Sequence, residues 1–555
     1  MRPAYVWAAM IVWTGIAVWI ASAARRGLGR GPGEFFIGGR RIRGFVAGMT
    51  YAATTYSAFM LVGLVGLTYQ EGVGALGFEM VYLVFTVLFL VVFGPRFWLV
   101  GNRYDFITPP ELLADRYRNR WVAVVAAAIS FVMLIPYASV QLMGAGLLVS
   151  GITGGRVPFV AGVLVMATLS GFSALWAGMR SVAWTDAFQA ITMILTSVAA
   201  LIFVSFSFFG SPAGFFETIT QEHPDLLRFT WSPGFFVGLT LPWAFFALTN
   251  PQVSQRMYIP DSVLSVRRMI LYFAAFGFVY TIISTLFGYQ AASIFPGLEN
   301  ADEAMPRLLG QVPAALGLVI FIGIFGAASS TLGSILLTLS SLFVRDIVRH
   351  LRPSVAEETQ TWMGRLSTLG LIAACIGFAW ARPGLITVVS SMASGGLLTM
   401  APAIIGTFFW KRATAAGALV SMGVGAVVTG SMYLTGFYPL GWWPSVWGLA
   451  LTTVLFVTVS LVTRPPDGAA DYIDRLELEL EERGFRRRRR TLAAAVYSNP
   501  RPAQNTKNRS MWRSQKPHSW MPGSTVYSWS MPTLVSRAWY RSFASNRKSS
   551  DPHAI

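Results

Sequence analysis

The sequence contains little of what a soluble enzyme uses for folding or chemistry. Charged residues make up only 12% of the 555 residues, whereas a typical soluble protein has roughly 25%. Cys375 is the single cysteine, which excludes an intramolecular disulfide and a cysteine metal cluster. All four histidines lie outside the long apolar segments: His223, His350, His518 and His553. The apolar segments therefore lack a histidine that could bind a metal or relay protons.

Long apolar runs are what the sequence has in abundance. Hydrophobic residues account for 54% of the chain, and a helix needs about 20 of them to cross a bilayer. We expect an all-α membrane protein with about 13 transmembrane helices. The predicted segments are 5–24, 44–69, 74–95, 121–149, 157–177, 183–209, 233–250, 269–294, 312–343, 362–381, 384–409, 414–435 and 442–463.

The loops between these segments alternate in charge. Arginines concentrate in 25–43, 96–120, 251–268 and 345–361, while the loops between them are acidic or neutral. Lys and Arg mark the cytoplasmic side, so we expect the N-terminus outside and the C-terminus inside. The net charge of +18 then indicates contacts of the basic loops and tail with anionic lipid, and not with nucleic acid. We expect a multi-pass protein of a cell membrane, and the compact loops favour a bacterial inner membrane.

The chain divides into three parts. Residues 1–463 form one transmembrane domain, 464–490 include a charged cytoplasmic helix, and the basic tail 491–555 has the composition of a disordered segment. Two five-helix repeats of opposite topology, about 44–210 and 233–409, are compatible with the segment count. The first helix of each repeat should be broken, because the first contains a polar run at 52–57 and the second contains Pro242 and Asn250-Pro251.

Two polar runs inside apolar segments are the strongest functional signal. They are Ala52–Ser57 and Ala327–Thr331, and polar groups at membrane depth are costly unless they serve a purpose. Ala327, Ser330 and Thr331 are three and four residues apart, which places one carbonyl and two hydroxyls on one helix face. Oxygen ligands alone suit a hard cation, so we interpret the runs as two halves of a sodium site.

Several motifs, in order, resemble the sodium:solute symporter family, whose members have the inverted-repeat transporter fold. The resemblance covers about residues 34–425. The motifs are Phe35-Phe36-Ile37-Gly38-Gly39-Arg40, Gly63-Leu64-Val65-Gly66, Trp184-Thr185-Asp186-Ala187-Phe188-Gln189, Gln255-Arg256 with Arg267-Arg268, Ser330-Thr331 with Ser340-Ser341 and Arg345-Asp346, and Phe409-Trp410-Lys411-Arg412.

The resemblance implies a set of ion-binding residues. Carbonyls of Ala53, Tyr56 and Ala327 and the hydroxyls of Ser330 and Thr331 would hold Na⁺. The structural alternative is that such hydroxyls bond back to their own helix and mediate packing. Asp186 matches a family residue that helps Na⁺ leave toward the cytoplasm. Its structural alternatives are a favourable interaction with the helix dipole and an ion pair with Arg180.

The solute should lie beside the broken helices. We expect Thr55, Ser57, Met60, Trp243 and Phe246 to line its site. Glu79 is the other acid inside an apolar segment, so it is either a substrate contact or a structural acid that snorkels or is paired.

The prediction is sodium-coupled uptake, by alternating access, of a small polar solute: an amino acid, a monocarboxylate, a vitamin or a polyol. Na⁺ is the coupling ion, and we expect no organic cofactor and no enzyme activity, since Glu79 and Asp186 lie on opposite sides of the membrane. A proton-coupled transporter of the same fold and a transporter-like sensor remain alternatives. The sequence names neither the solute nor the oligomeric state.

Overall fold

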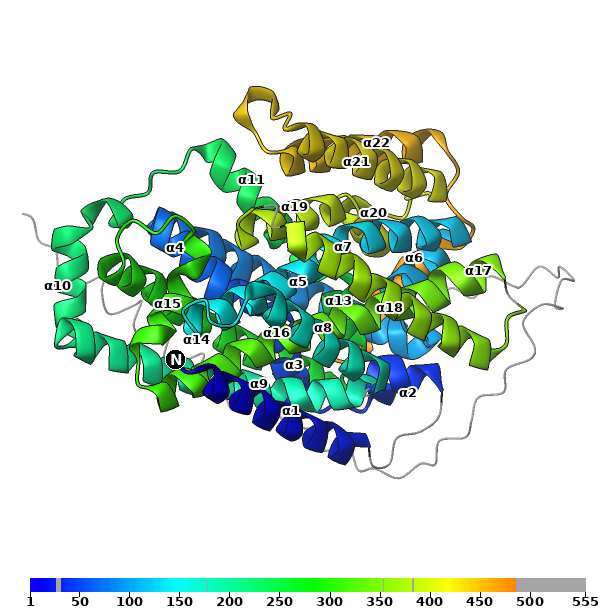
Figure 1. Cartoon of the computed structure of the whole chain (residues 1–555). Helices are drawn as coiled ribbons and strands as arrows, with labels where there is room; N and C mark the ends of the chain where they lie inside the picture. Colours follow the sequence, from blue (N-terminus) through cyan, green and yellow to red (C-terminus); the bar gives the residue numbers. More distant parts are fainter. Residues whose placement is uncertain (26–30, 177, 353, 382–383, 486–555) are drawn as a thin grey trace, which may run out of the picture. The chain divides into compact units, whose positions relative to one another are not determined.

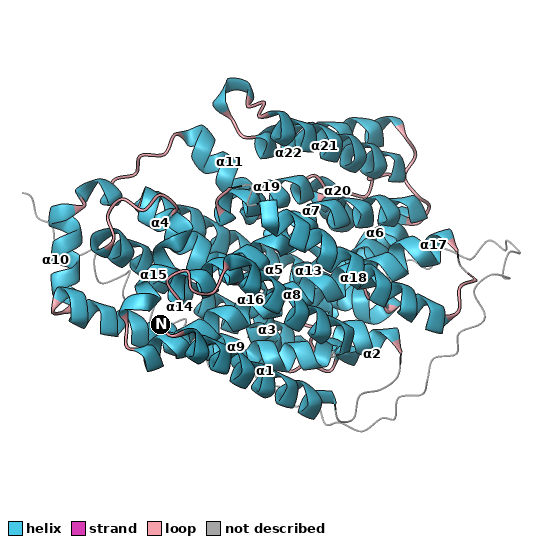
Figure 2. Cartoon of the chain, in the orientation of Figure 1, coloured by secondary structure: helices cyan, strands magenta, loops and turns pink. Residues whose placement is uncertain are grey.

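The computed structural model describes residues 1–485 except 26–30, 177, 353 and 382–383. This part of the chain consists of helices and connecting loops (Figure 2). Its one extended pairing is a single bridge between Ile42 and Pro260. The helices are α1 (Pro3–Arg25), α2 (Pro32–Ile37), α3 (Gly44–Thr55), α4 (Val65–Glu71), α5 (Val73–Tyr104), α6 (Pro109–Tyr117), α7 (Arg120–Ile152), α8 (Phe159–Trp176), α9 (Gly178–Phe209), α10 (Pro212–Glu222), α11 (Pro233–Ala244), α12 (Phe246–Thr249), α13 (Pro251–Ser254), α14 (Val263–Ile294), α15 (Ala304–Gln311), α16 (Ala314–Leu342), α17 (Arg349–Leu351), α18 (Glu357–Ala381), α19 (Ile386–Leu398), α20 (Ala401–Phe409), α21 (Ala415–Thr435), α22 (Pro444–Val462) and α23 (Ala469–Glu482).

Ten of the described helices are long and apolar enough to span a bilayer, or twelve if two bent pairs each form one span. They are α1, α5, α7, α8, α9, α14, α16 with its continuation to Leu351, α18, α21 and α22, and the bent pairs are α3 with α4 and α19 with α20. The all-helical membrane fold is therefore confirmed. The seventh predicted segment, 233–250, is divided into α11 and α12, so neither part is long enough alone.

The break in the first polar run is present. α3 ends at Thr55, and the chain resumes as a π-helical turn, Phe59–Leu64, that leads into α4. The two arms are bent by 51°. The predicted second break lies at Phe245, three residues after Pro242, with a further break at Asn250. The sequence did not predict the 45° bend between α19 and α20. The inverted repeat itself stays a prediction.

The broken helices lie among the longest helices of the fold (Figure 1). α3 packs against α14, α9 and α16, and α19 packs against α7 and α11. α21 and α22 lie side by side at the top of the view. Backbone groups at each break are thus held inside protein, which is where a membrane protein tolerates irregular backbone.

One predicted loop is not a loop. Residues 251–268 were expected to connect two spans, yet α13 and the 3₁₀ turn Gln255–Tyr258 fold inward and are fully buried. The expectation was wrong because it followed charge alone. Arg256 has partners inside the protein that offset the cost of its burial, as the next subsection describes.

A charged helix, α23, follows the last apolar helix. Its apolar face buries Ile473, Leu476 and Leu480, and its acids pair with basic residues of the apolar region, for example Glu479 with Arg103 at 3.0 Å. The end of the predicted charged segment, 486–490, and the whole predicted tail, 491–555, lie outside the described residues.

Candidate functional site

The end of α3 is bonded directly to the middle of α16. The Thr331 hydroxyl donates a hydrogen bond of 3.0 Å to the carbonyl oxygen of Ala53. That carbonyl lies in the last turn of α3, where a continuing helix would have used it. The backbone leaves helical geometry at Tyr56, with φ −101° and ψ 88°. The break in α3 therefore releases an oxygen that a side chain of α16 contacts.

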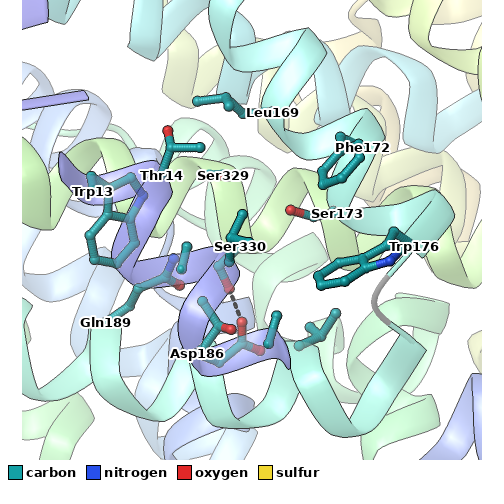
Figure 3. Close-up of a pocket in the computed structure, with 16 residues that line it drawn as sticks. Trp13, Thr14, Leu169, Phe172, Ser173, Trp176, Asp186, Gln189, Ser329 and Ser330 are labelled. Atoms are coloured by element: carbon teal, nitrogen blue, oxygen red, sulfur yellow. Dashed lines mark hydrogen bonds between the residues drawn. The ribbon is translucent and has the colours of Figure 1, made fainter. Parts of the chain in front are cut away.

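Ser330, the neighbour of Thr331, faces a third helix. Its hydroxyl donates to a carboxylate oxygen of Asp186 in α9, and Figure 3 shows this bond at the centre of a pocket. The Thr50 hydroxyl of α3 donates to the other carboxylate oxygen of Asp186 at 2.5 Å. Asp186 thus joins α3, α9 and α16, the three elements that surround the predicted ion position.

The charge of Asp186 is balanced by Arg256 and not by Arg180. Arg256 Nη2 lies 3.2 Å from Asp186 Oδ2, and the two side chains are 0% and 1% exposed. Arg256 also donates to Ser334 at 2.7 Å, to Thr50 at 3.1 Å and to a backbone carbonyl at 2.7 Å. The structural alternative of an ion pair with Arg180 is wrong, because the buried turn at 255–258 brings Arg256 to this carboxylate.

The structure brings the predicted sodium residues into one neighbourhood to different degrees. Ala53 and Thr331 are in direct contact, and Ser330 is adjacent to Thr331 but bonded to Asp186. Ala327 lies one turn before Thr331 in α16. Tyr56 lies just beyond the end of α3, with its ring stacked on Phe273 of α14 at 5.6 Å. The oxygen donors suit a hard cation, and the described residues contain no group of three His, Cys, Asp or Glu that could hold another metal.

A pocket reaches Ser330 and Asp186 from the side of α1. Figure 3 shows Trp13 of α1 and Trp176 of α8 on opposite sides of this pocket, with Gln189 of α9 beside Asp186. Its wall combines these aromatic rings with the polar groups of the ion pair region. One face of the Asp186 cluster is therefore bordered by a cavity and is not fully enclosed by side chains.

A second cluster is aromatic and lies around the break in the second predicted repeat. We call it the aromatic cluster; its rings are Phe59, Phe78, Tyr82, Tyr137, Trp243 and Phe246. Trp243 stacks on Phe59 at a centroid distance of 4.3 Å and on Phe246 at 5.1 Å. The indole N–H of Trp243 donates to the Ser391 hydroxyl of α19 at 2.7 Å. The cluster joins both broken segments to α5, α7 and α19.

The other predicted lining residues are all buried near the first break. Thr55 donates back to the Tyr51 carbonyl at 2.7 Å, a common arrangement for threonine in membrane helices. The Ser57 hydroxyl accepts from the Phe59 N–H at 3.2 Å, and Met60 is fully buried. Glu79 of α5 is 0% exposed, and neither of its carboxyl oxygens has a hydrogen-bond partner among the described residues.

Sequence reasoning missed three residues that complete these clusters: Arg256, Tyr82 and Tyr137. Tyr82 is three residues after Glu79, so helical spacing could have placed both on one face of α5. Arg256 stands in the Gln255-Arg256 motif but was assigned to a loop. Tyr137 carries no local signal, because one tyrosine in a long apolar helix is ordinary.

Comparison with known proteins finds a family model and several relatives. The model of the sodium:solute symporter family matches residues 35–425. The chain is 27% identical over 447 residues to the sodium/pantothenate symporter of Escherichia coli (strain K12), covering 78% of this chain and 91% of that protein. It is 26% identical over 419 residues to the sodium/proline symporter of Haemophilus influenzae, covering 71% and 81%.

A solved structure has the same fold. The structure of a Na⁺-coupled sialic acid symporter in a substrate-bound outward-open state superposes with a TM-score of 0.71 at 18% identity, covering 83% of this chain and 98% of that chain. At this level of identity the likeness concerns the fold alone.

Proposed function

The chain belongs to the sodium:solute symporter family, and we propose that it couples the inward movement of Na⁺ to the uptake of a small polar organic solute by alternating access. The family supports sodium-coupled solute transport. The observation that carries the proposal is the hydrogen bond between Thr331 and the Ala53 carbonyl at the break of α3. It brings a hydroxyl of one helix and a freed carbonyl of another to the same point, which is how broken helices coordinate ions.

In this proposal Na⁺ is held by the carbonyls of Ala53, Tyr56 and Ala327 and by the hydroxyls of Ser330 and Thr331. Na⁺ would enter between the Thr331 hydroxyl and the Ala53 carbonyl and replace their mutual hydrogen bond. The Ser330 hydroxyl must turn from Asp186 toward the ion. Binding of Na⁺ would then tie α3 to α16 more strongly than one neutral hydrogen bond does.

Asp186 would assist the departure of Na⁺. Its carboxylate is one hydrogen bond away from Ser330, so an ion leaving the site meets a negative charge next. Arg256 already holds this carboxylate. Arg256 and Na⁺ therefore compete for Asp186, and the arginine would return to it once the ion has moved on.

The solute would bind at the aromatic cluster. Thr55, Ser57, Met60, Glu79, Trp243 and Phe246 are the proposed contacts. The rings supply a flat apolar wall, and buried polar groups beside it orient the solute. An amino acid, a monocarboxylate, a vitamin and a polyol are the classes considered from the sequence.

The driving force is electrical as well as chemical. One charge that crosses a potential of 100 mV releases about 2.3 kcal/mol. We place the protein as a multi-pass protein of a bacterial inner membrane, with its N-terminus outside, its C-terminus inside and its basic loops against anionic lipid. We propose no enzyme activity and no organic cofactor.

The test begins with sodium alone. Purified full-length protein in detergent is heated in NaCl and in KCl, and a higher melting temperature in NaCl is expected because Na⁺ binds the folded state. Thr331→Ala and Ser330→Ala should each abolish this difference. Ser329→Ala is the matched control, since the neighbouring Ser329 hydroxyl faces Ser170 of α8. Equal stability of the native chain in both salts would remove the sodium site.

Transport is then measured in liposomes. Solutes that stabilise the protein are tested for uptake driven by an inward Na⁺ gradient, with a proton gradient as the comparison. Uptake that follows the proton gradient and ignores Na⁺ would favour the proton-coupled alternative. Binding without uptake under either gradient would favour the sensor alternative.

A further inference from the structure

Glu79 is a buried acid whose carboxyl group makes no hydrogen bond with the described residues. Its side chain is 0% exposed in α5, and both carboxyl oxygens lack a hydrogen-bond partner among the described residues. Asp186, by contrast, accepts hydrogen bonds from Ser330, Thr50 and Arg256. A buried carboxyl group without partners is costly, so its retention points to a partner that comes from outside the chain.

Three buried tyrosine hydroxyls lie within electrostatic reach of Glu79: those of Tyr56, Tyr82 and Tyr137. The Tyr82 hydroxyl has no hydrogen-bond partner among the described residues, whereas the Tyr56 and Tyr137 hydroxyls lie beside those of Thr281 and Ser57. Tyr82 and Tyr137 also belong to the aromatic cluster, with ring centroids 5.1 and 6.3 Å from that of Trp243. The carboxyl group therefore lies at the border between a polar region and a wall of rings.

The buried basic residues of the described chain are engaged elsewhere. They are three arginines: Arg96, Arg116 and Arg256. Arg96 pairs with Glu477, Arg116 donates to carbonyls of Thr407 and Trp410, and Arg256 pairs with Asp186. A solute that carries only negative charge would meet Glu79 without a cation between them. Acidic solutes that lack a positive group are therefore disfavoured at this site.

We propose that the transported solute carries an ammonium group, which pairs with the Glu79 carboxylate while its carbon substituents lie against the aromatic cluster. This proposal rests on the proposed function and narrows its substrate class. An ammonium group neutralises the buried charge, and the faces of Trp and Tyr rings attract cations. A neutral polyol would supply hydrogen bonds but would leave the carboxylate charge uncompensated. The tyrosine hydroxyls would contact other polar atoms of the same solute.

The experiment uses pairs of probes that share a shape and differ in charge. One pair is choline and 3,3-dimethylbutan-1-ol, and the other is proline and cyclopentanecarboxylate; myo-inositol and pantothenate serve as neutral and acidic probes. Melting of the full-length protein in detergent is titrated with each probe in NaCl and in KCl. We expect at least one ammonium probe to stabilise the protein in NaCl, with its uncharged or purely acidic counterpart at least about tenfold weaker.

Variants assign the effect to Glu79. Glu79→Gln keeps the shape and should weaken the ammonium probe by at least about tenfold, while stabilisation by Na⁺ alone is unchanged. Glu79→Asp keeps the charge and should retain part of the affinity. Glu222→Gln, at an exposed acid of α10, is the control for a change in net charge.

Two results would overturn the proposal: a panel in which no ammonium probe stabilises the protein, whether or not myo-inositol or pantothenate does, or an ammonium response that Glu79→Gln leaves intact. These results differ from failure of the proposed function, in which Na⁺ and K⁺ give the same melting temperature with and without every probe.

Discussion

Asp186 and Glu79 are both fully buried acids of apolar helices, and the protein treats them in opposite ways. Asp186 has a guanidinium and two hydroxyls around it. Glu79 has aromatic rings and the unsatisfied Tyr82 hydroxyl near it, and no partner for its own oxygens among the described residues. The first arrangement is complete without a ligand, whereas the second is incomplete. Burial alone therefore does not identify a binding residue. A buried acid is a candidate when its carboxyl oxygens have no hydrogen-bond partner in the chain.

The largest expected effect comes from removing the cation that pairs with Asp186. Arg256→Gln leaves Asp186 buried without its cation, and we expect a loss of roughly 3–5 kcal/mol in the free energy of unfolding. Apparent melting temperatures in detergent would measure it. Arg307→Gln is the matched control, because Arg307 pairs with Glu303 at 2.8 Å on the surface. That exposed pair should contribute at most about 1 kcal/mol, so equal losses in the two variants would contradict this account.

A third buried acid lies between the two extremes. Asp302, in the connection between α14 and α16, is 3% exposed and accepts one hydrogen bond, from the Ile386 N–H at the start of α19. Burial raises the pKa of Asp302 to about 7, and the Ile386 N–H offsets only part of that rise.

The pH dependence of stability follows from this raised pKa. The folded state keeps the proton that the unfolded state releases near pH 4, so stability should fall as the pH rises from about 4 to about 7. Asp302→Asn can still accept from Ile386 and should lose this slope, which makes it more stable than the native chain at pH 8 by up to roughly 4 kcal/mol. Melting curves from pH 5 to pH 8 test it. Parallel curves for the two proteins would show that Asp302 is not the group responsible.

A smaller effect should follow from removing the hydrogen bond between Thr331 of α16 and the Ala53 carbonyl of α3. Thr331→Val removes one neutral hydrogen bond, which should cost about 1 kcal/mol in KCl. In NaCl the cost should be larger, because an ion ligand is lost as well. A melting comparison in both salts measures the difference. Identical losses in NaCl and KCl would mean that Thr331 holds the two helices together but does not bind the ion.

The smallest loss of stability is expected at Glu79. Glu79→Gln removes a carboxyl group that has no partner to strand, so it should lower the free energy of unfolding without solute by less than about 1 kcal/mol. Any gain in stability would come from the removal of a costly unpartnered acid. Asp186→Asn should cost several times more, because Arg256 then loses its counter-ion. Melting of both variants in KCl provides the measurement. A large destabilisation by Glu79→Gln would show that Glu79 is a structural acid and would erase the contrast.

Much of the fold could be predicted, because its cause is local in the sequence. Runs of about 20 apolar residues must become helices in lipid, since backbone groups there have no other partners. The break at 52–57 was also local, since polar residues interrupt an apolar run. The bend between α19 and α20 was missed, although Pro402 in the first turn of α20 is a local signal for a helix break.

The candidate site was predictable where it depended on residue type and helix periodicity, as for Ser330 and Thr331. The prediction failed where the site depends on residues far apart in the sequence. Arg256 is 70 residues from Asp186 in sequence, and charge alone assigned it to a loop. A guanidinium can be buried when a carboxylate and carbonyls receive its hydrogens, and only the packing of α3, α9 and α16 around it provides them.

The sequence by itself determined that this is a helical membrane protein with two oxygen-rich runs inside apolar segments, because hydropathy and side-chain chemistry belong to each residue. The tertiary structure decided which buried charges have partners. Pairing depends on distances between atoms of different helices, and these distances exist only once the helices have packed.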